Sequence, residues 1–131
     1  MKILLVKKNK ATRPLYSFFD TISEGLCFKI YNKFQSYVQY GDIYHGKQLK
    51  ALNSKIWKYK GTIYKLRVDN GNESARILFA KSEGHLIIIH AFLKSTRKTP
   101  AREAKQAITL YKTLQHLETF VWDEPSAVLK I

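Results

Sequence analysis

Basic and aromatic side chains occupy alternate positions in two stretches that have the pattern of β-strands, residues 63–68 and 85–93. Successive side chains of a strand point to opposite faces, so Lys65 and Arg67 share one face of the first strand. If both strands belong to one sheet, the side chains expected together on its outer face are Lys65, Arg67, His90, Phe92 and Lys94, with Arg76 of an intervening strand near the rim.

The alternation over residues 85–93 also predicts which apolar side chains face the helices. The expected inward set is Ile87, Ile89, Ala91 and Leu93, and the expected outward set is Leu86, Ile88, His90, Phe92 and Lys94. Taken singly, His90 and Phe92 are more typical of core positions than of functional ones, and it is their convergence with the basic residues on one expected face that favours a functional site.

A cluster of this composition suits the cleavage of RNA without a metal ion. Arginine binds phosphate oxygens in a bidentate manner and stabilises the extra charge of a pentavalent transition state. A histidine, or a lysine with a lowered pKa, can take the 2′-hydroxyl proton or protonate the departing 5′-oxygen. An exposed phenylalanine can stack on a base.

The sequence contains no motif for a metal or a nucleotide cofactor. A pair of catalytic carboxylates, an HExxH or CxxC motif and a P-loop are all missing, so we expect neither a metal nor another cofactor. The single cysteine, Cys27, excludes an internal disulfide and is flanked by Leu26 and Phe28. We expect a core thiol in a protein of the reducing cytoplasm.

The chain is strongly basic. It has 23 Lys and Arg residues against 10 Asp and Glu, a net charge of +13 and a pI near 9.9. A pI above about 9 is typical of nucleic-acid-binding domains, although a basic protein without that function has the same signature. The apolar run of residues 3–6 is too short for a signal peptide, and no stretch is long enough to span a membrane, so a soluble cytoplasmic protein is expected.

Two amphipathic helices are predicted in the first third of the chain. Thr12 is expected to cap the first, whose apolar stripe covers residues 15–22. Ser23 is expected to cap the second, whose stripe covers residues 26–38 and which Gly41 should end.

A meander of three strands and a further helix should follow. The expected strands are residues 63–68, 76–80 and 85–93, joined by the turn sequences Asp69-Asn70-Gly71-Asn72 and Ser82-Glu83-Gly84. Thr99 should cap a helix that Pro100 starts, and residues 119–122 should form a short edge strand. The fold class is therefore α+β in a single domain, residues 1–131, with two N-terminal helices on a small antiparallel sheet and a further helix after the third strand.

Three segments in this order resemble the RelE/ParE toxin superfamily, and within it the HigB-like, phage-derived branch. They are residues 63–67 (IYKLR), 75–79 (ARILF) and 87–100 (IIIHAFLKSTRKTP). The resemblance extends from about residue 46 to residue 117 and implies a RelE-like fold. It also implies a toxin of a type II toxin–antitoxin pair that enters the A site of the 30S ribosomal subunit. There the toxin cuts mRNA through a 2′-hydroxyl and leaves a cyclic phosphate.

The resemblance also implies roles for individual residues. Arg67 and Arg76 would hold the scissile phosphate, His90 and Lys94 would transfer protons, Phe92 would shape the base pocket, and Lys65, Arg97 and Lys98 would contact RNA. Lys65 stands where the branch usually has glutamate. The expected partners are a cognate antitoxin with an acidic segment, the ribosome and mRNA.

Two alternatives remain open from the sequence. ParE-like members share the fold but inhibit DNA gyrase, and a non-enzymatic basic protein would bind RNA or the ribosome without cutting RNA. The histidine and the basic strand face favour RNA cleavage over the gyrase inhibitor.

Overall fold

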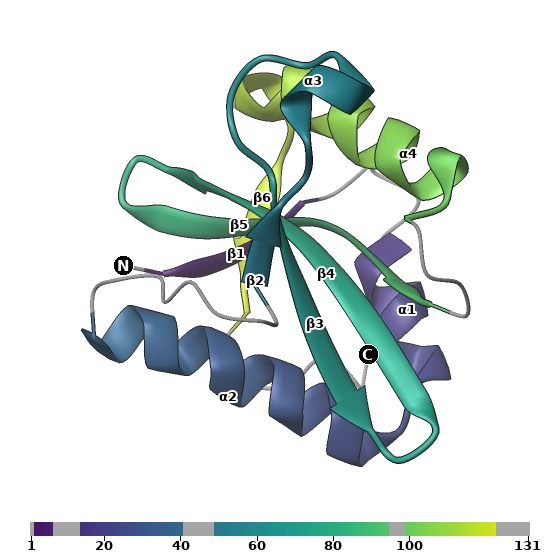
Figure 1. Ribbon diagram of the computed structural model, residues 1–131. Helices are drawn as coiled ribbons and strands as arrows, with labels where there is room; N and C mark the ends of the chain where they lie inside the picture. The colour runs from purple at the N-terminus through teal and green to yellow at the C-terminus, as the bar shows by residue number, and fades with distance from the viewer. Residues whose placement is uncertain (1, 7–13, 41–48, 95–98, 123–131) are drawn as a thin grey trace.

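The computed structural model describes residues 2–6, 14–40, 49–94 and 99–122, and in this part of the chain a mixed sheet forms the centre (Figure 1). The strands are β1 (Ile3–Val6), β2 (Leu49–Ala51), β3 (Tyr64–Asn70), β4 (Glu73–Ser82), β5 (His85–Leu93) and β6 (Thr119–Val121). Their order across the sheet is β2-β3-β4-β5-β1-β6. Neighbouring strands from β2 to β5 are antiparallel, β1 runs parallel to β5, and β6 is antiparallel to β1.

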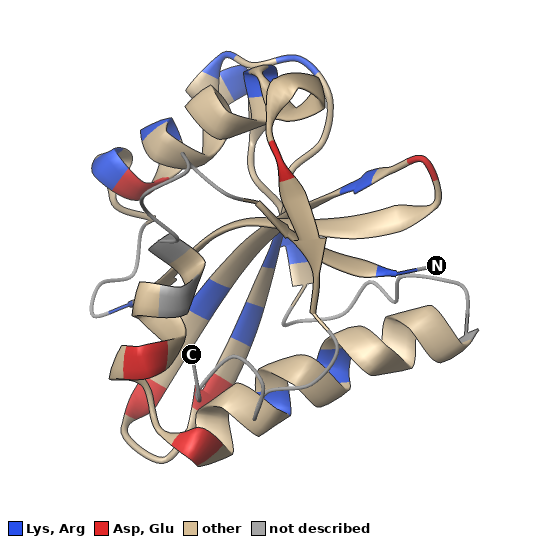
Figure 2. Ribbon diagram, turned by 180° about the vertical axis from the view of Figure 1, so that it is seen from behind, with Lys and Arg blue, Asp and Glu red and all other residues tan. Residues whose placement is uncertain are grey.

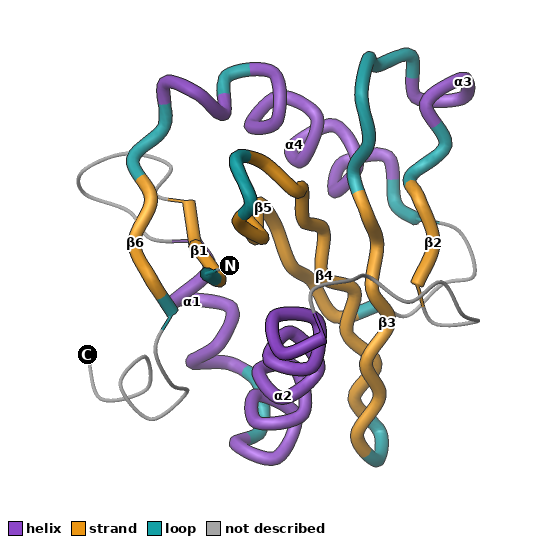
Figure 3. Tube along the Cα trace, turned by 90° about the vertical axis from the view of Figure 1, so that its left-hand side faces the viewer, coloured by secondary structure: helices purple, strands orange, loops and turns teal. Residues whose placement is uncertain are grey.

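Helices cover both faces of this sheet (Figure 3). One face carries α1 (Pro14–Thr21) and α2 (Glu24–Tyr40), and the other carries α4 (Ala101–Lys112), with the short α3 (Ser54–Trp57) beside it. A 3₁₀ turn, η1 (Leu114–His116), follows α4. The α+β class is confirmed, although the sheet is larger than expected and mixed rather than antiparallel throughout. No helix in the described residues is long and apolar enough to cross a membrane.

The helix pair forms as its apolar spacing predicts. The hydroxyl of Ser23 accepts a hydrogen bond from the backbone N–H of Leu26 at 3.1 Å, which is the expected N-cap of α2. Leu26, Ile30 and Phe34 of the stripe are fully buried against the sheet. The expected cap at Thr12 and stop at Gly41 lie outside the described residues.

Both turns of the meander lie where the sequence places them. Gly71 and Asn72 connect β3 to β4, and Gly71 has a left-handed φ of +59°. Glu83 and Gly84 connect β4 to β5 with φ values of 51° and 77°, the backbone that a type I′ hairpin requires at both positions.

A β-bulge in β5 reverses the faces on which the residues of its first half were expected to lie. Leu78 of β4 pairs with His90, but the next residue, Phe79, pairs with Ile88, so Ile89 is an extra residue in β5. As a result Ile88 packs in the core under α1 and α2, and Ile89 packs on the α4 side with Leu110. The expected alternation therefore holds for His90, Ala91 and Phe92 and is wrong for the residues before the bulge, and Leu93, expected against the helices, is 46% exposed.

Strands form at both ends of the described part of the chain, one of them unexpected and the other expected. Residues 3–6 form a central strand with Ile3 and Leu5 buried, where no strand was expected. The edge strand near the C-terminus is confirmed as β6, paired with β1. The start of α4 after Pro100 is also confirmed, but Thr99 does not cap it, because its hydroxyl accepts a hydrogen bond from Lys65 instead.

Candidate functional site

Strand register brings most of the expected basic side chains onto the α4 side of the sheet. Paired positions across β2, β3, β4 and β5 form one row, Lys50, Lys65, Leu78 and His90, and a second row, Arg67, Arg76 and Phe92. We call the side chains of Lys50, Lys65, Arg67, Arg76 and Lys94 the cationic face. Figure 2 shows its basic bands on the neighbouring strands. Neighbouring strands lie about 4.8 Å apart, so the two arginines stand side by side.

Arg76 is the most enclosed member of the cationic face, with 8% of its surface exposed. Its Nη1 donates to Ser74 Oγ at 2.8 Å and to the carbonyl of Ala75 at 3.0 Å, so the guanidinium has a fixed position. Burial, followed by repulsion from Arg67, lowers the pKa of Arg76. A partly desolvated, fixed cation of this kind is suited to binding an anion.

A carboxylate and a hydroxyl connect the two arginines. Arg67 Nε donates to Asp69 Oδ2 at 2.8 Å, and Ser74 Oγ donates to Asp69 Oδ1 at 2.6 Å. Hydrogen bonds from Ser74 and then from Arg67 lower the pKa of Asp69, against an opposing effect of burial. Asp69 and Ser74, at the end of the β3–β4 hairpin, therefore hold both guanidinium groups in position.

Two lysines, Lys65 and Lys94, lie close to the arginines of the cationic face. Lys65 Nζ donates to the hydroxyl of Thr99 at 2.8 Å, which joins β3 to the start of α4. Burial and the charges of Lys94, Arg76 and Lys50 lower the pKa of Lys65. Burial and the charges of Arg76, Arg67 and Lys50 lower that of Lys94. Each therefore gives up its proton more readily than an ordinary lysine.

His90 lies on the same side of the sheet but under the edge of α4. Its Nε2 contacts Glu103 Oε2 of α4, and the two side chains are 14% and 20% exposed. Phe92, with its ring centroid 6.0 Å from that of His90, is only 7% exposed and packs in the core beneath α4. The expectation of an exposed stacking platform at Phe92 is wrong, because α4 covers this part of the face.

The remaining expectations fall in different places. Arg97 and Lys98 lie outside the described residues. Cys27 is fully buried, as expected for a core thiol, and burial together with the charge of Glu24 raises its pKa to about 11. Within the described residues no group of three His, Cys, Asp or Glu side chains could hold a metal ion.

Several residues of the site were missed from the sequence. Lys50 is on a strand of three residues, too short to show alternation. The sequence pattern indicates only a turn at Asp69, although its side chain binds Arg67 and Ser74. Nothing in the sequence pairs Glu103 of α4 with a histidine on another element, and only the packing of α4 on the sheet brings it to His90.

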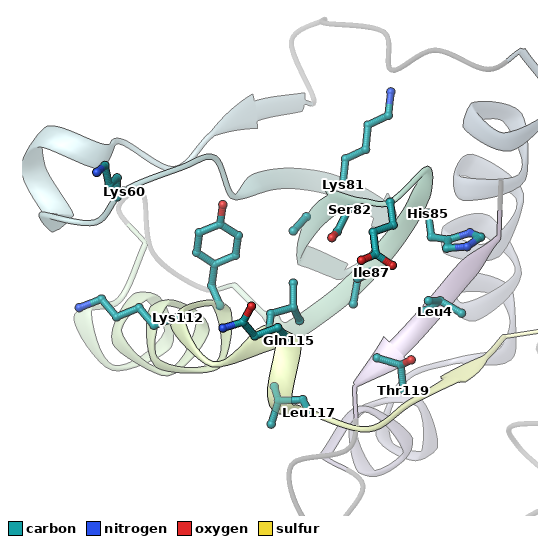
Figure 4. A pocket seen from close by; sticks show the side chains of 14 residues that line it. Leu4, Lys60, Lys81, Ser82, His85, Ile87, Lys112, Gln115, Leu117 and Thr119 are labelled. Carbon is teal, nitrogen blue, oxygen red and sulfur yellow. The ribbon is translucent and has the colours of Figure 1, made fainter.

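A separate hollow of about 630 Å³ lies elsewhere, between the β4–β5 turn, the end of α4 and the strands β1 and β6 (Figure 4). Leu4, Ile87 and Leu117 contribute apolar walls, and Lys60 and Lys112 stand at one side. None of the residues of the cationic face lines it, so the candidate site is the sheet face and not this hollow.

The arrangement on the sheet defines a class of protein: a RelE-like α+β fold that presents fixed basic side chains on one sheet face. The model of the phage-derived protein Gp49-like family (DUF891) matches residues 17–112, and the chain belongs to that family. The family is associated with the toxins of toxin–antitoxin systems, whose partner is an antitoxin. A search of curated proteins gave no match to the chain.

Proposed function

We propose that the protein is a HigB-like toxin that cuts mRNA on the ribosome, by attack of a 2′-hydroxyl and without a metal ion. The observation that carries this proposal is the pairing of Arg67 with Arg76 in register, flanked by Lys65 and Lys94. Two adjacent guanidinium groups with lysines beside them match the charge of a phosphodiester and of its transition state.

Phosphate binding is assigned to the two arginines. Arg76 is fixed by its bonds to Ser74 and Ala75, so little reorganisation is needed when a phosphate binds. Arg67 is more exposed, with 52% of its side chain accessible, and its Nε is engaged by Asp69. The terminal nitrogens of Arg67 then serve as the second clamp on the non-bridging oxygens.

Proton transfer is assigned to Lys94 and His90. One group takes the 2′-hydroxyl proton as the 2′-oxygen attacks phosphorus, and the other protonates the 5′-oxygen as the P–O5′ bond breaks. The products are a 2′,3′-cyclic phosphate and a 5′-hydroxyl end. The lowered pKa of Lys94 makes its neutral form more accessible near neutral pH, which suits a base.

Glu103 is assigned as the residue that positions His90. Its carboxylate contacts Nε2 and so holds the orientation of the ring. Since Nε2 is engaged in this way, the proton exchanged with RNA passes through Nδ1. Lys65, Arg97 and Lys98 are assigned to the RNA backbone, and Phe92, which is buried, supports the base pocket from below.

The partners follow from the same assignment. An acidic segment of a cognate antitoxin would neutralise the cationic face, and charge complementarity would accelerate this association. Ribosome-bound message as substrate places the protein in the cytoplasm. The net charge of +13 supports both polyanionic partners.

The test is inducible expression followed by mapping of the 5′ ends of cellular messages. We expect cuts inside translated codons that disappear when translation is blocked, and no cuts with Arg76→Ala. Lys81→Ala, an exposed lysine on the same strand β4, is the matched control and should cut normally. Intact messages together with loss of gyrase supercoiling would favour a ParE-like toxin, and intact messages on a stably bound ribosome would favour a non-enzymatic binder.

A further inference from the structure

Charge is separated between two ends of the described molecule (Figure 2). The end formed by α3, the loop after it and α4 carries six exposed basic side chains, Lys55, Lys58, Lys60, Arg102, Lys105 and Lys112. The one carboxylate of these elements, Glu103, is engaged with His90. The opposite end, where α1 meets α2 and the β3–β4 turn, carries Asp20, Glu24, Asp69 and Glu73.

Helical spacing collects the basic side chains of α4 on its outer surface. Arg102, Lys105 and Lys112 are exposed, whereas Ala104 and Ala107 face the core. Residues three, four and seven apart share one side of a helix, so the three cations form a stripe along most of the 12-residue helix. At 1.5 Å per residue that stripe is about 15 Å long.

The α3 loop is built rigidly from its own hydrogen bonds. The side chain of Asn53 accepts from the backbone N–H groups of Lys55 and Ile56, both at 3.0 Å, and so caps α3. The hydroxyl of Tyr59 donates to the carbonyl of Leu52 at 2.6 Å and accepts from the N–H of Ile63 at 3.1 Å. The loop is therefore closed at its base by a buried tyrosine.

The loop is also joined to α4. The hydroxyl of Tyr111 accepts from the backbone N–H of Thr62 at 3.2 Å. Gly61, with φ of +106°, lets the tyrosine approach so closely that a Cβ there would lie 2.1 Å from its hydroxyl oxygen. The lysines of the loop and the stripe of α4 consequently belong to one rigid surface, which we call the α3–α4 platform, comprising residues 53–62 and 101–112.

The α3–α4 platform carries an exposed apolar side chain among its lysines. Ile56 is 68% exposed, the most exposed of the large apolar side chains of the described residues. Lys58, with a left-handed φ of 54°, is the C-cap of α3, and its backbone N–H donates to the carbonyl of Ser54, so the end of the helix fixes its position. An exposed apolar side chain among fixed lysines can lie against ribose or a base while the lysines reach phosphates.

We infer that the α3–α4 platform docks on ribosomal RNA while the cationic face holds the message. This inference rests on the proposed function and adds which surface of the protein contacts the ribosome and how the protein is oriented there. The platform faces the RNA of the ribosome, and the acidic end points away from it. A folded RNA offers phosphates at fixed spacing, which a rigid stripe of cations matches without loss of conformational entropy. Lys65, bonded to Thr99 at the start of α4, makes the platform continuous with the cationic face.

The test compares two triple variants with the same change in charge. Lys55→Gln/Lys58→Gln/Lys60→Gln removes three cations from the platform. Lys2→Gln/Lys33→Gln/Lys81→Gln is the control and removes three exposed cations that lie just before β1, in α2 and in β4. Binding to purified ribosomes is measured by co-sedimentation over a range of salt concentrations, and thermal unfolding shows that both variants fold.

We expect the platform variant to bind about ten- to a hundredfold more weakly near 0.1 M salt, with a salt slope smaller by about 2 to 3. The control variant should lose much less, and neither variant should change the chemistry on ribosomes at saturation. Equal losses in the two variants would overturn the inference and leave the proposed function standing. Loss of antitoxin binding with normal ribosome binding would instead make the platform a site for an acidic protein. A wild-type protein that does not bind ribosomes at all would remove the proposed ribosome dependence as well.

Discussion

Replacement of Arg76 by alanine should separate catalysis from stability. In the folded protein this guanidinium makes two hydrogen bonds, to Ser74 Oγ and to the carbonyl of Ala75. Each bond from a charged donor contributes about 1.5–3 kcal/mol, but burial of a cation beside Arg67 opposes that gain, as the lowered pKa of Arg76 shows. We therefore expect a net loss of only about 1–2 kcal/mol in the free energy of unfolding.

The effect of Arg76→Ala on cleavage should be larger. Removal of one preorganised donor to a transition-state oxyanion typically lowers kcat by about 10²–10³, equivalent to about 2.7–4 kcal/mol. We expect a loss of this size in kcat, with KM changed less, because the phosphodiester already carries one charge when it binds and a further charge develops on it in the transition state.

The assay is primer extension on a message under translation with purified protein, under single-turnover conditions. Arg76→Lys keeps the positive charge but loses the bidentate geometry of the guanidinium, so it should recover only part of the rate. If folded Arg76→Ala protein cuts within tenfold of the wild-type rate, Arg76 does not bind the scissile phosphate. If the rate falls only as far as the folded fraction falls, its role is structural.

The remaining predictions concern the histidine contact, a lysine and two glycines. Glu103→Gln should lower kcat with KM retained, and should add no loss in a His90→Ala background; additive losses would show that Glu103 does not act through His90. Lys65→Met should raise the melting temperature at neutral pH. The unfolded state binds more protons than the folded state between the lowered pKa and the ordinary value of 10.5, so stability rises with pH there. The advantage of Lys65→Met should therefore shrink as thermal scans approach that pH, and a pH-independent difference would contradict the assigned cause. Gly61→Ala should destabilise the protein by more than about 2 kcal/mol, against about 1 kcal/mol for Gly71→Ala, whose added Cβ meets no atom within 4 Å; equal denaturation midpoints would show that the contact with α4 yields freely.

The elements that depend on local patterns could be predicted well. The apolar stripe and cap of α2, the turn at Gly71 and the start of α4 after Pro100 all depend on residues within a few positions of each other. The same local alternation placed Lys65 and Arg67 on one face of β3. Short-range backbone and side-chain preferences suffice for features of this kind.

Other features depend on partners that are distant in the chain. Residues 3–6 look like an isolated apolar run, and they become a central strand only by pairing in parallel with β5, more than 80 residues later. The bulge at Ile89 appears only when β4 and β5 are paired, and it reverses the phase of every position before it. The burial of Phe92 could not be predicted from the strand alone, because it depends on α4 folding back over that part of the sheet.

By itself the sequence determined the two N-terminal helices, the meander of β3, β4 and β5, the helix α4, the edge strand β6 and the basic character of one strand face, because periodicity and turn chemistry act over a few residues. The tertiary structure alone decided that Arg67 lies opposite Arg76, that Glu103 holds His90, and that Tyr111 fastens the α3 loop to α4. Each of these contacts joins residues brought together by strand register or by packing of a helix on the sheet. That geometry is set by the burial of the whole core and not by any local segment.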